Sequence, residues 1–100
     1  SEPGCVLKVQ VISAKGLRAA DWNGKSDPFC VCELTGKPDT KFQTKTISKT
    51  LAPVWNEEKE IDDYELGDCL EFRVYDYDLG SANDLLGRAL LPCNAFDREG

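Results

Sequence analysis

Six short segments of the chain combine β-branched or aromatic residues with alternating polar and apolar side chains. They are residues 5–12, 29–34, 41–47, 54–61, 69–75 and 86–91. Gly, Pro, Asn and Asp residues that favour turns lie between them. Alternation of this kind is typical of strands with one buried face, and no segment has the period of an amphipathic helix. The pattern predicts an all-β fold, an antiparallel β-sandwich with about six strands.

Length and charge limit what such a chain can do. Its 100 residues, 41% hydrophobic and 30% charged, suit a single folded domain over residues 1–100. The net charge is −6, with +3 on residues 1–50 and −9 on residues 51–100. We therefore expect no nucleic-acid partner, because affinity for nucleic acids rests on cations that neutralise phosphates. An acidic chain instead needs a basic partner or a cation.

Catalysis finds no support in the residue types. The chain has no histidine, and it contains neither a GxSxG motif nor a P-loop, so we expect no enzyme. Its five cysteines have no CxxC spacing and an odd count. We expect them to be free thiols in a reducing compartment, where they act mostly as small core residues.

The aspartates fall in two loops. Asp21 and Asp27 bracket the loop between the first two expected strands, and Asp76, Asp78 and Asp84 bracket the loop after the fifth. In an extended chain Asp76 and Asp78 face the same side with Cα atoms about 6.6 Å apart, so both can reach one ion. Clustered carboxylates repel one another, and a calcium ion relieves that repulsion. The alternative is that each aspartate separately caps a turn.

Three blocks of sequence carry a resemblance to a known family. They are LRAADWNGKSDPF at 17–29, residues 44–57 with KTLAPVWNE, and VYDYDLGSANDLLG at 74–87. In this order they resemble the C2 domain, the calcium- and phospholipid-binding β-sandwich of protein kinase C and the synaptotagmins. That family has eight strands. The resemblance therefore implies that the chain is truncated at its C-terminus, and that the two missing strands follow Gly100.

The resemblance also implies a ligand set for two or three calcium ions. The side-chain ligands are Asp21, Asp27, Asp76, Asp78 and Asp84, joined by the carbonyls of Trp22 and Tyr77 and the hydroxyl of Ser81. In the family a membrane completes the coordination. Because all five acidic positions are present, a calcium-dependent member is favoured.

Two loop residues are candidates for membrane contact. Trp22 lies at the tip of the first loop and suits the interfacial region of a bilayer, although it could instead fold back onto the sandwich. Leu79 in the second loop is a possible companion. Trp55 lies within an expected strand, and we expect it to pack in the core.

Lysines recur every four residues at Lys37, Lys41, Lys45 and Lys49. They form either a solvated sheet edge or a patch for anionic lipid, for which Lys41 and Lys45 are the candidates. Some C2 domains bind phosphoinositides on a basic face. Lys45 matches one of its lysines, whereas Gln43 and Val31 replace basic residues there.

These patterns predict a module that binds anionic phospholipid membranes when calcium is present. Phosphatidylserine is the expected lipid, and the parent protein is expected to be cytoplasmic and reversibly recruited. Two bound Ca²⁺ would change the formal charge from −6 to −2. The alternative is a protein-interaction module, either stabilised by calcium or independent of it.

Overall fold

A computed structural model describes residues 5–17, 26–78 and 82–91 of the chain. The strands are β1 (Cys5–Ser13), β2 (Pro28–Leu34), β3 (Lys37–Gln43), β4 (Val54–Tyr64), β5 (Leu70–Asp76) and β6 (Asp84–Leu91). Every strand pair is antiparallel. No helix in these described ranges is long and apolar enough to cross a membrane. The predicted all-β fold is confirmed.

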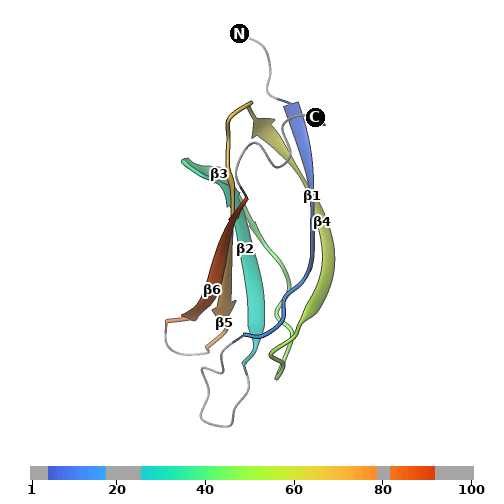
Figure 1. Ribbon diagram of the computed structural model, residues 1–100, viewed down its shortest axis with the longest axis vertical. Helices are drawn as coiled ribbons and strands as arrows, with labels where there is room; N and C mark the ends of the chain where they lie inside the picture. The colour runs from blue at the N-terminus through green and yellow to red at the C-terminus, as the bar shows by residue number, and fades with distance from the viewer. Residues whose placement is uncertain (1–4, 18–25, 79–81, 92–100) are drawn as a thin grey trace.

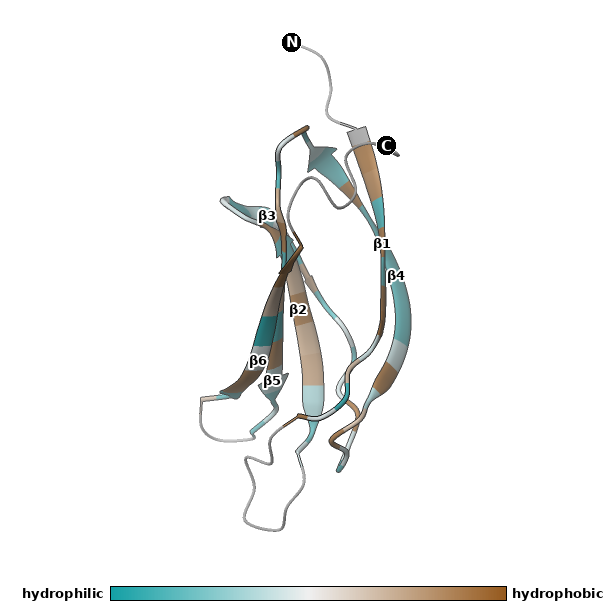
Figure 2. Cartoon of the chain, viewed as in Figure 1, coloured by the Kyte–Doolittle hydropathy of each residue, from teal (hydrophilic) through white to brown (hydrophobic). Residues whose placement is uncertain are grey.

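The strands form two facing sheets, which Figure 1 shows from the side. One sheet has two strands in the order β1-β4, and the other has four in the order β3-β2-β5-β6. Figure 2 shows that β2 is largely apolar and β4 largely polar. This difference follows from position, since β2 lies inside its sheet, whereas β4 buries one face only.

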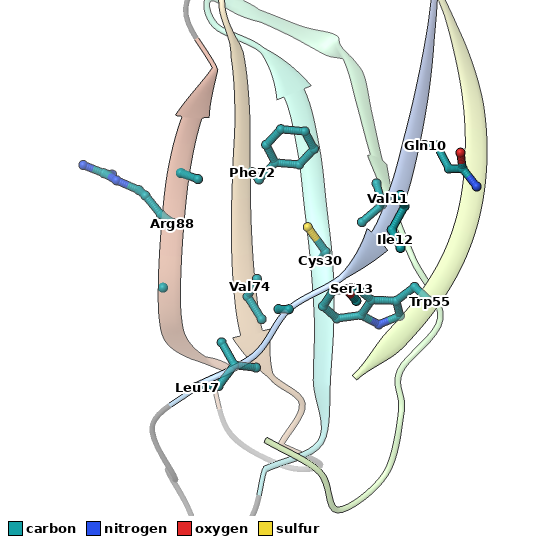
Figure 3. A pocket seen from close by; sticks show the side chains of 13 residues that line it. Gln10, Val11, Ile12, Ser13, Leu17, Cys30, Trp55, Phe72, Val74 and Arg88 are labelled. Atoms are coloured by element: carbon teal, nitrogen blue, oxygen red, sulfur yellow. The ribbon is translucent and has the colours of Figure 1, made fainter. Parts of the chain in front are cut away.

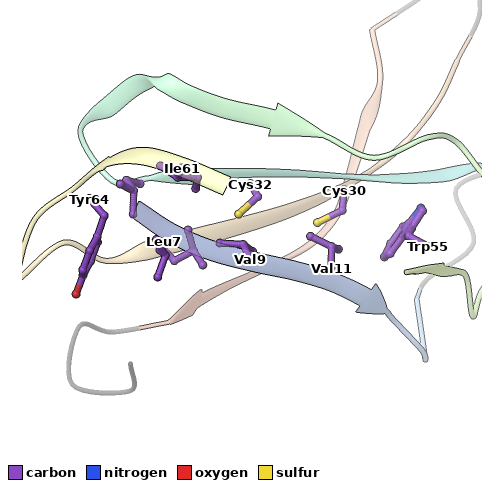
Figure 4. Packing of buried hydrophobic residues seen from close by; sticks show 10 residues of the cluster. Leu7, Val9, Val11, Cys30, Cys32, Trp55, Ile61 and Tyr64 are labelled. Carbon is purple, nitrogen blue, oxygen red and sulfur yellow. The ribbon is translucent and has the colours of Figure 1, made fainter. Parts of the chain in front are cut away.

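The core lies between the sheets. Leu7, Val9 and Val11 of β1 point toward Cys30 and Cys32 of β2, as Figure 4 shows. The cluster also contains Leu34, Trp55, Ile61, Tyr64 and Leu70. Trp55 is 4% exposed, which confirms its predicted place in the core.

The cysteines that the structure describes are free, as expected: Cys30, Cys32 and Cys69. Burial raises the pKa of Cys30 to about 11 and that of Cys32 to about 12. Both thiols are therefore protonated at neutral pH and pack as small hydrophobic groups.

The third strand differs from the prediction. It covers residues 37–43 rather than 41–47, because the turn is shorter than the expected loop at 36–39. Leu34 pairs with Lys37, and Gly36 between them has a φ of 82°, a conformation that glycine adopts without strain. Pro38 is tolerated because β3 is an edge strand.

The two sheets differ in width, so the described residues leave part of the apolar surface between them uncovered. A groove of about 400 Å³ lies between β1 and β6, and Phe72, Val74 and Trp55 line its apolar wall (Figure 3). Leu91, at the end of β6, is 38% exposed. The free edge of β1 borders this groove.

Candidate metal centre

Three strand ends meet at one end of the four-stranded sheet. Asp76, the last residue of β5, pairs with Pro28 at the start of β2 and with Asp84 at the start of β6. Asp27 directly precedes Pro28. The fold therefore brings Asp27, Asp76 and Asp84 to one end of the sheet, which we call the acidic end. Asp78 follows two residues beyond β5.

Backbone hydrogen bonds hold the two central carboxylates of the acidic end. The Asp27 N–H donates to Asp76 Oδ1 at 2.8 Å, and the Lys49 N–H donates to Asp27 Oδ1 at 2.7 Å. The Tyr77 N–H donates to the Asp27 carbonyl at 2.9 Å. Asp76 is 2% exposed and Asp27 is half-buried. Each carboxylate thus has one oxygen fixed by a main-chain donor.

The other two carboxylates lie at the surface. Asp78 and Asp84 are exposed, and so is Tyr77, whose carbonyl is a predicted ligand. The Asp78 N–H donates to Asn83 Oδ1 at 2.8 Å, which joins the two stems of the loop between β5 and β6. Asp78 is therefore held close to the start of β6.

The donor set at the acidic end suits a hard cation. Among the described residues, none of its four carboxylates forms an ion pair with Lys or Arg. Oxygen ligands of this kind are those that calcium prefers. However, the described parts of the chain contain no group of three or more acidic, histidine or cysteine residues close enough to hold a metal. The predicted Asp21, Trp22, Leu79 and Ser81 lie outside the described residues.

Carboxylates at the opposite end of the sheet have a cationic partner. Lys37 Nζ lies 2.7 Å from Asp68 Oδ2 and 3.4 Å from Glu65 Oε1, and it donates to the Asp63 carbonyl at 2.7 Å. We call this the paired end. The hydrogen bond from Lys37 to Asp68 raises the pKa of Lys37. Lys37, at the start of the edge strand β3, is thus part of an ion pair.

The pKa of Asp68 reflects two opposing effects, burial and hydrogen bonding. Burial alone would raise the pKa of Asp68. The hydrogen bonds from Lys37 and from the Glu65 N–H outweigh this effect and hold the pKa below its usual value.

The outer face of the four-stranded sheet carries little free positive charge. Arg73 forms an ion pair with Glu33 and lies 3.9 Å from Glu71. Val31 is 7% exposed, and Gln43 lies opposite it on β3. Lys41 and Lys45, the predicted lipid contacts, are exposed.

A hollow on this outer face is lined by aromatic and polar side chains. It measures about 350 Å³, and the stacked rings of Phe29 and Tyr75, with centroids 5.7 Å apart, form part of its wall. Lys41 and Arg73 also line it. Since Arg73 is ion-paired, Lys41 is the cation that this hollow can offer to an anion.

Comparison with known proteins identifies the family. The family model described as "C2 domain" matches residues 5–100. The chain belongs to the C2 domain family. Its fold is similar to a solved C2 domain of plant Extended Synaptotagmin 1, with a TM-score of 0.85 and 30% identity, over 94% of this chain and 72% of that one.

The chain spans only a small part of the larger proteins that it resembles. Multiple C2 and transmembrane domain-containing protein 2 of Mus musculus is 42% identical over 87 residues, which are 87% of this chain and 10% of the relative. Human GIVD cytosolic phospholipase A2, solved with an inhibitor and terbium chloride, has a TM-score of 0.80 and 32% identity, over 93% of this chain and 14% of that one. The C2 domain is a non-catalytic module found in proteins of different activity.

Two residues at the acidic end were missed by sequence reasoning. Lys49 contributes a backbone N–H, and a backbone contact leaves no trace in side-chain type. The contact of Asn83 could have been predicted, since the side chain of Asn in a loop just before a strand commonly forms a hydrogen bond with nearby main chain.

Proposed function

We propose that this C2 domain binds anionic phospholipid membranes in a calcium-dependent manner and so recruits a cytoplasmic parent protein to the membrane. The observation that carries the proposal is the acidic end. Asp27, Asp76 and Asp84 lie at adjacent strand ends without a cationic partner among the described residues. The carboxylates of the paired end have Lys37 as an internal cationic partner, whereas those of the acidic end have none among the described residues.

The proposed site combines described and undescribed residues. Asp27, Asp76, Asp78 and Asp84 would hold two or three calcium ions together with Asp21, the carbonyls of Trp22 and Tyr77, and Ser81. Since the Oδ1 atoms of Asp27 and Asp76 accept main-chain hydrogen bonds, their Oδ2 atoms are the oxygens proposed to face the ions. The related phospholipase has been solved with terbium chloride, the salt of a hard cation.

Membrane binding follows from a change of local charge. Without calcium, the acidic end repels anionic headgroups. With two calcium ions the formal charge changes from −6 to −2, and phosphatidylserine oxygens complete the coordination while Trp22 and Leu79 enter the interface. Lipid and ion share the site, so each raises the other's affinity by the same factor.

Lipid preference follows from the outer face. Arg73 is ion-paired and Val31 is buried, so this face offers a phosphoinositide mainly Lys41 and Lys45. A lysine near an anionic surface contributes only about 1 kcal/mol. Calcium bridging to phosphatidylserine should therefore dominate binding.

Vesicle sedimentation tests this function. Binding should require both Ca²⁺ and phosphatidylserine, with no binding to phosphatidylcholine vesicles or in the presence of a chelator. Added phosphoinositide should strengthen binding only slightly. Binding that persists in chelator would contradict the calcium switch.

The second candidate function is protein interaction. The edge strand β3 favours it, because no further described strand pairs with its outer side and such an edge can accept a strand. Vesicle binding and capture of a protein partner separate the two functions. A domain that fails to bind phosphatidylserine vesicles with calcium, yet retains a protein partner, would favour the interaction module.

We also propose that two further strands complete the smaller sheet. The partly exposed Leu91 and the apolar groove beside β1 support this. A polypeptide extended by about 25–30 residues, enough for two strands, should melt at a higher temperature. An extended chain that is no more stable than residues 1–100 would contradict the proposal.

A further inference from the structure

The segment 47–53 contacts both ends of the loop that contains Asp21. At the N-terminal end of that loop, the Ala14 N–H donates to the Pro53 carbonyl at 3.1 Å, and the Leu17 N–H donates to the Leu51 carbonyl at 3.3 Å. These contacts fix the chain where it leaves β1.

The same segment fixes the C-terminal end of the loop. The Ile47 N–H donates to the Pro28 carbonyl at 3.0 Å, and the Thr50 N–H donates to the Ser26 carbonyl at 2.8 Å. Between these two bonds, the Lys49 N–H donates to Asp27 Oδ1 at 2.7 Å. One short segment thus spans both ends and also holds a carboxylate of the acidic end.

The backbone of Lys49 makes this last contact possible. Its φ of 56° lies in the left-handed region, which is uncommon for residues other than glycine. The side chain is exposed and forms no ion pair with the described residues. The contact to Asp27 therefore depends on backbone conformation rather than on the lysine charge.

We propose that segment 47–53 orients the calcium site and that Lys49 is its positioning residue. This inference rests on the proposed calcium function. The Lys49 N–H holds Asp27 Oδ1, and Asp27 in turn donates its own N–H to Asp76 Oδ1, so a single chain of contacts orients both carboxylates before the ion arrives. Preorganisation of this kind lowers the cost of binding.

Four variants with the same charge are compared with one another to test the role of the backbone: Lys49→Gly, Lys49→Asn, Lys49→Ala and Lys49→Val. All remove the lysine charge, and they differ in how well they tolerate a positive φ, from Gly through Asn to Ala and then Val. Calcium affinity measured by calorimetry should fall in that order. The Val variant should bind roughly fivefold or more weakly than the Gly variant, since a left-handed conformation disfavours β-branched residues most.

The melting temperature without calcium gives the structural control. If all four variants bind calcium equally while their melting temperatures fall, segment 47–53 only supports the fold and the inference is overturned. If the Val variant does not fold, the calcium affinities of the Asn and Ala variants are compared instead. Equal affinities would again overturn the inference. The unmutated domain is measured first. If it does not bind calcium, the proposed function is overturned rather than the role of Lys49.

Amide exchange without calcium provides a readout independent of the metal. Loss of the Lys49 contact should speed exchange of the Asp27 amide more in the Val variant than in the Gly variant, while the core amide of Cys32 stays protected. Equal exchange at Asp27 in the two variants would contradict the positioning role.

Discussion

Carboxylates lie at both ends of the four-stranded sheet, but among the described residues only those at one end contact a lysine. At the paired end, Lys37 contacts Asp68 and Glu65. Burial would raise the pKa of Asp68, but the hydrogen bonds from Lys37 and from the Glu65 N–H together outweigh it and lower the pKa. At the acidic end, Asp27 and Asp76 receive only main-chain N–H donors among the described residues. Among the described residues, the carboxylates at one end of the sheet therefore have a cationic partner and those at the other end do not.

Under the proposed function, this difference distinguishes a structural ion pair from carboxylates that bind calcium. A carboxylate paired with lysine gains little from an added cation, because the lysine already supplies the charge. Carboxylates that are oriented by backbone donors have one oxygen engaged and leave the other available to a ligand. Substitutions at the two ends should consequently have different effects on stability and on calcium binding.

The largest expected effect is on the calcium-induced rise in melting temperature, when carboxylates at each end are replaced by amides. Asp76→Asn with Asp78→Asn should abolish the rise in melting temperature that millimolar Ca²⁺ produces, because the ligands are lost. The amide introduced by Asp76→Asn retains an oxygen that can accept the Asp27 N–H, so the fold should persist. Thermal melts with and without Ca²⁺ measure the effect.

Asp68→Asn is the matched control at the paired end. It should lower the melting temperature and leave the calcium-induced rise intact, since Asp68 contacts Lys37 rather than an ion. If Asp68→Asn removes the calcium effect as completely as the double substitution does, the distinction between the two ends is wrong.

The next effect concerns the proposed membrane anchor, Trp22. Trp22→Ala should weaken calcium-dependent binding to phosphatidylserine vesicles by about tenfold or more, since burial of such a side chain contributes on the order of 1.5–3 kcal/mol. Calcium-induced thermal stabilisation should stay nearly unchanged. Vesicle sedimentation over a range of lipid concentrations measures the affinity.

Leu66→Ala supplies the comparison for Trp22. Leu66 is 77% exposed near the paired end, so it should not contribute to vesicle binding. Equal losses for the two substitutions would show that anchoring does not depend on the acidic end.

The smallest effect is the pH dependence of the paired end. The folded pKa of Asp68 is lowered from 3.8, so its stabilising contribution is present above that pH and is lost as the pH falls toward the folded value. Melting temperatures of the unmutated domain and Asp68→Asn should differ by a few degrees near neutral pH and converge in acid. A difference that persists unchanged into strong acid would contradict the ion pair.

Sequence patterns predicted the strands well where burial decides the structure. Trp55 and the alternating residues of β1 lie in the core as expected, because one face of each strand must be buried. The third strand was misplaced because the turn conformation at Gly36, rather than the hydrophobic pattern, sets where β3 begins.

The candidate site was predicted in part. The positions of Asp27, Asp76 and Asp84 followed from loop spacing and family motifs, and strand pairing brings them to one end. The contact from Lys49 to Asp27 depends on a backbone angle, and the pairing of Lys37 with Asp68 joins residues that are far apart in sequence. Neither follows from local composition.

Calcium titration by calorimetry, with and without phosphatidylserine vesicles, tests the central claim most directly. We expect calcium to bind to the domain, and to bind more tightly when the vesicles are present, because lipid oxygens complete the coordination. Asp76→Asn with Asp78→Asn should remove the binding heat in both conditions, whereas Asp68→Asn should retain it. An absence of binding heat in the folded, unmutated domain under both conditions would contradict the account.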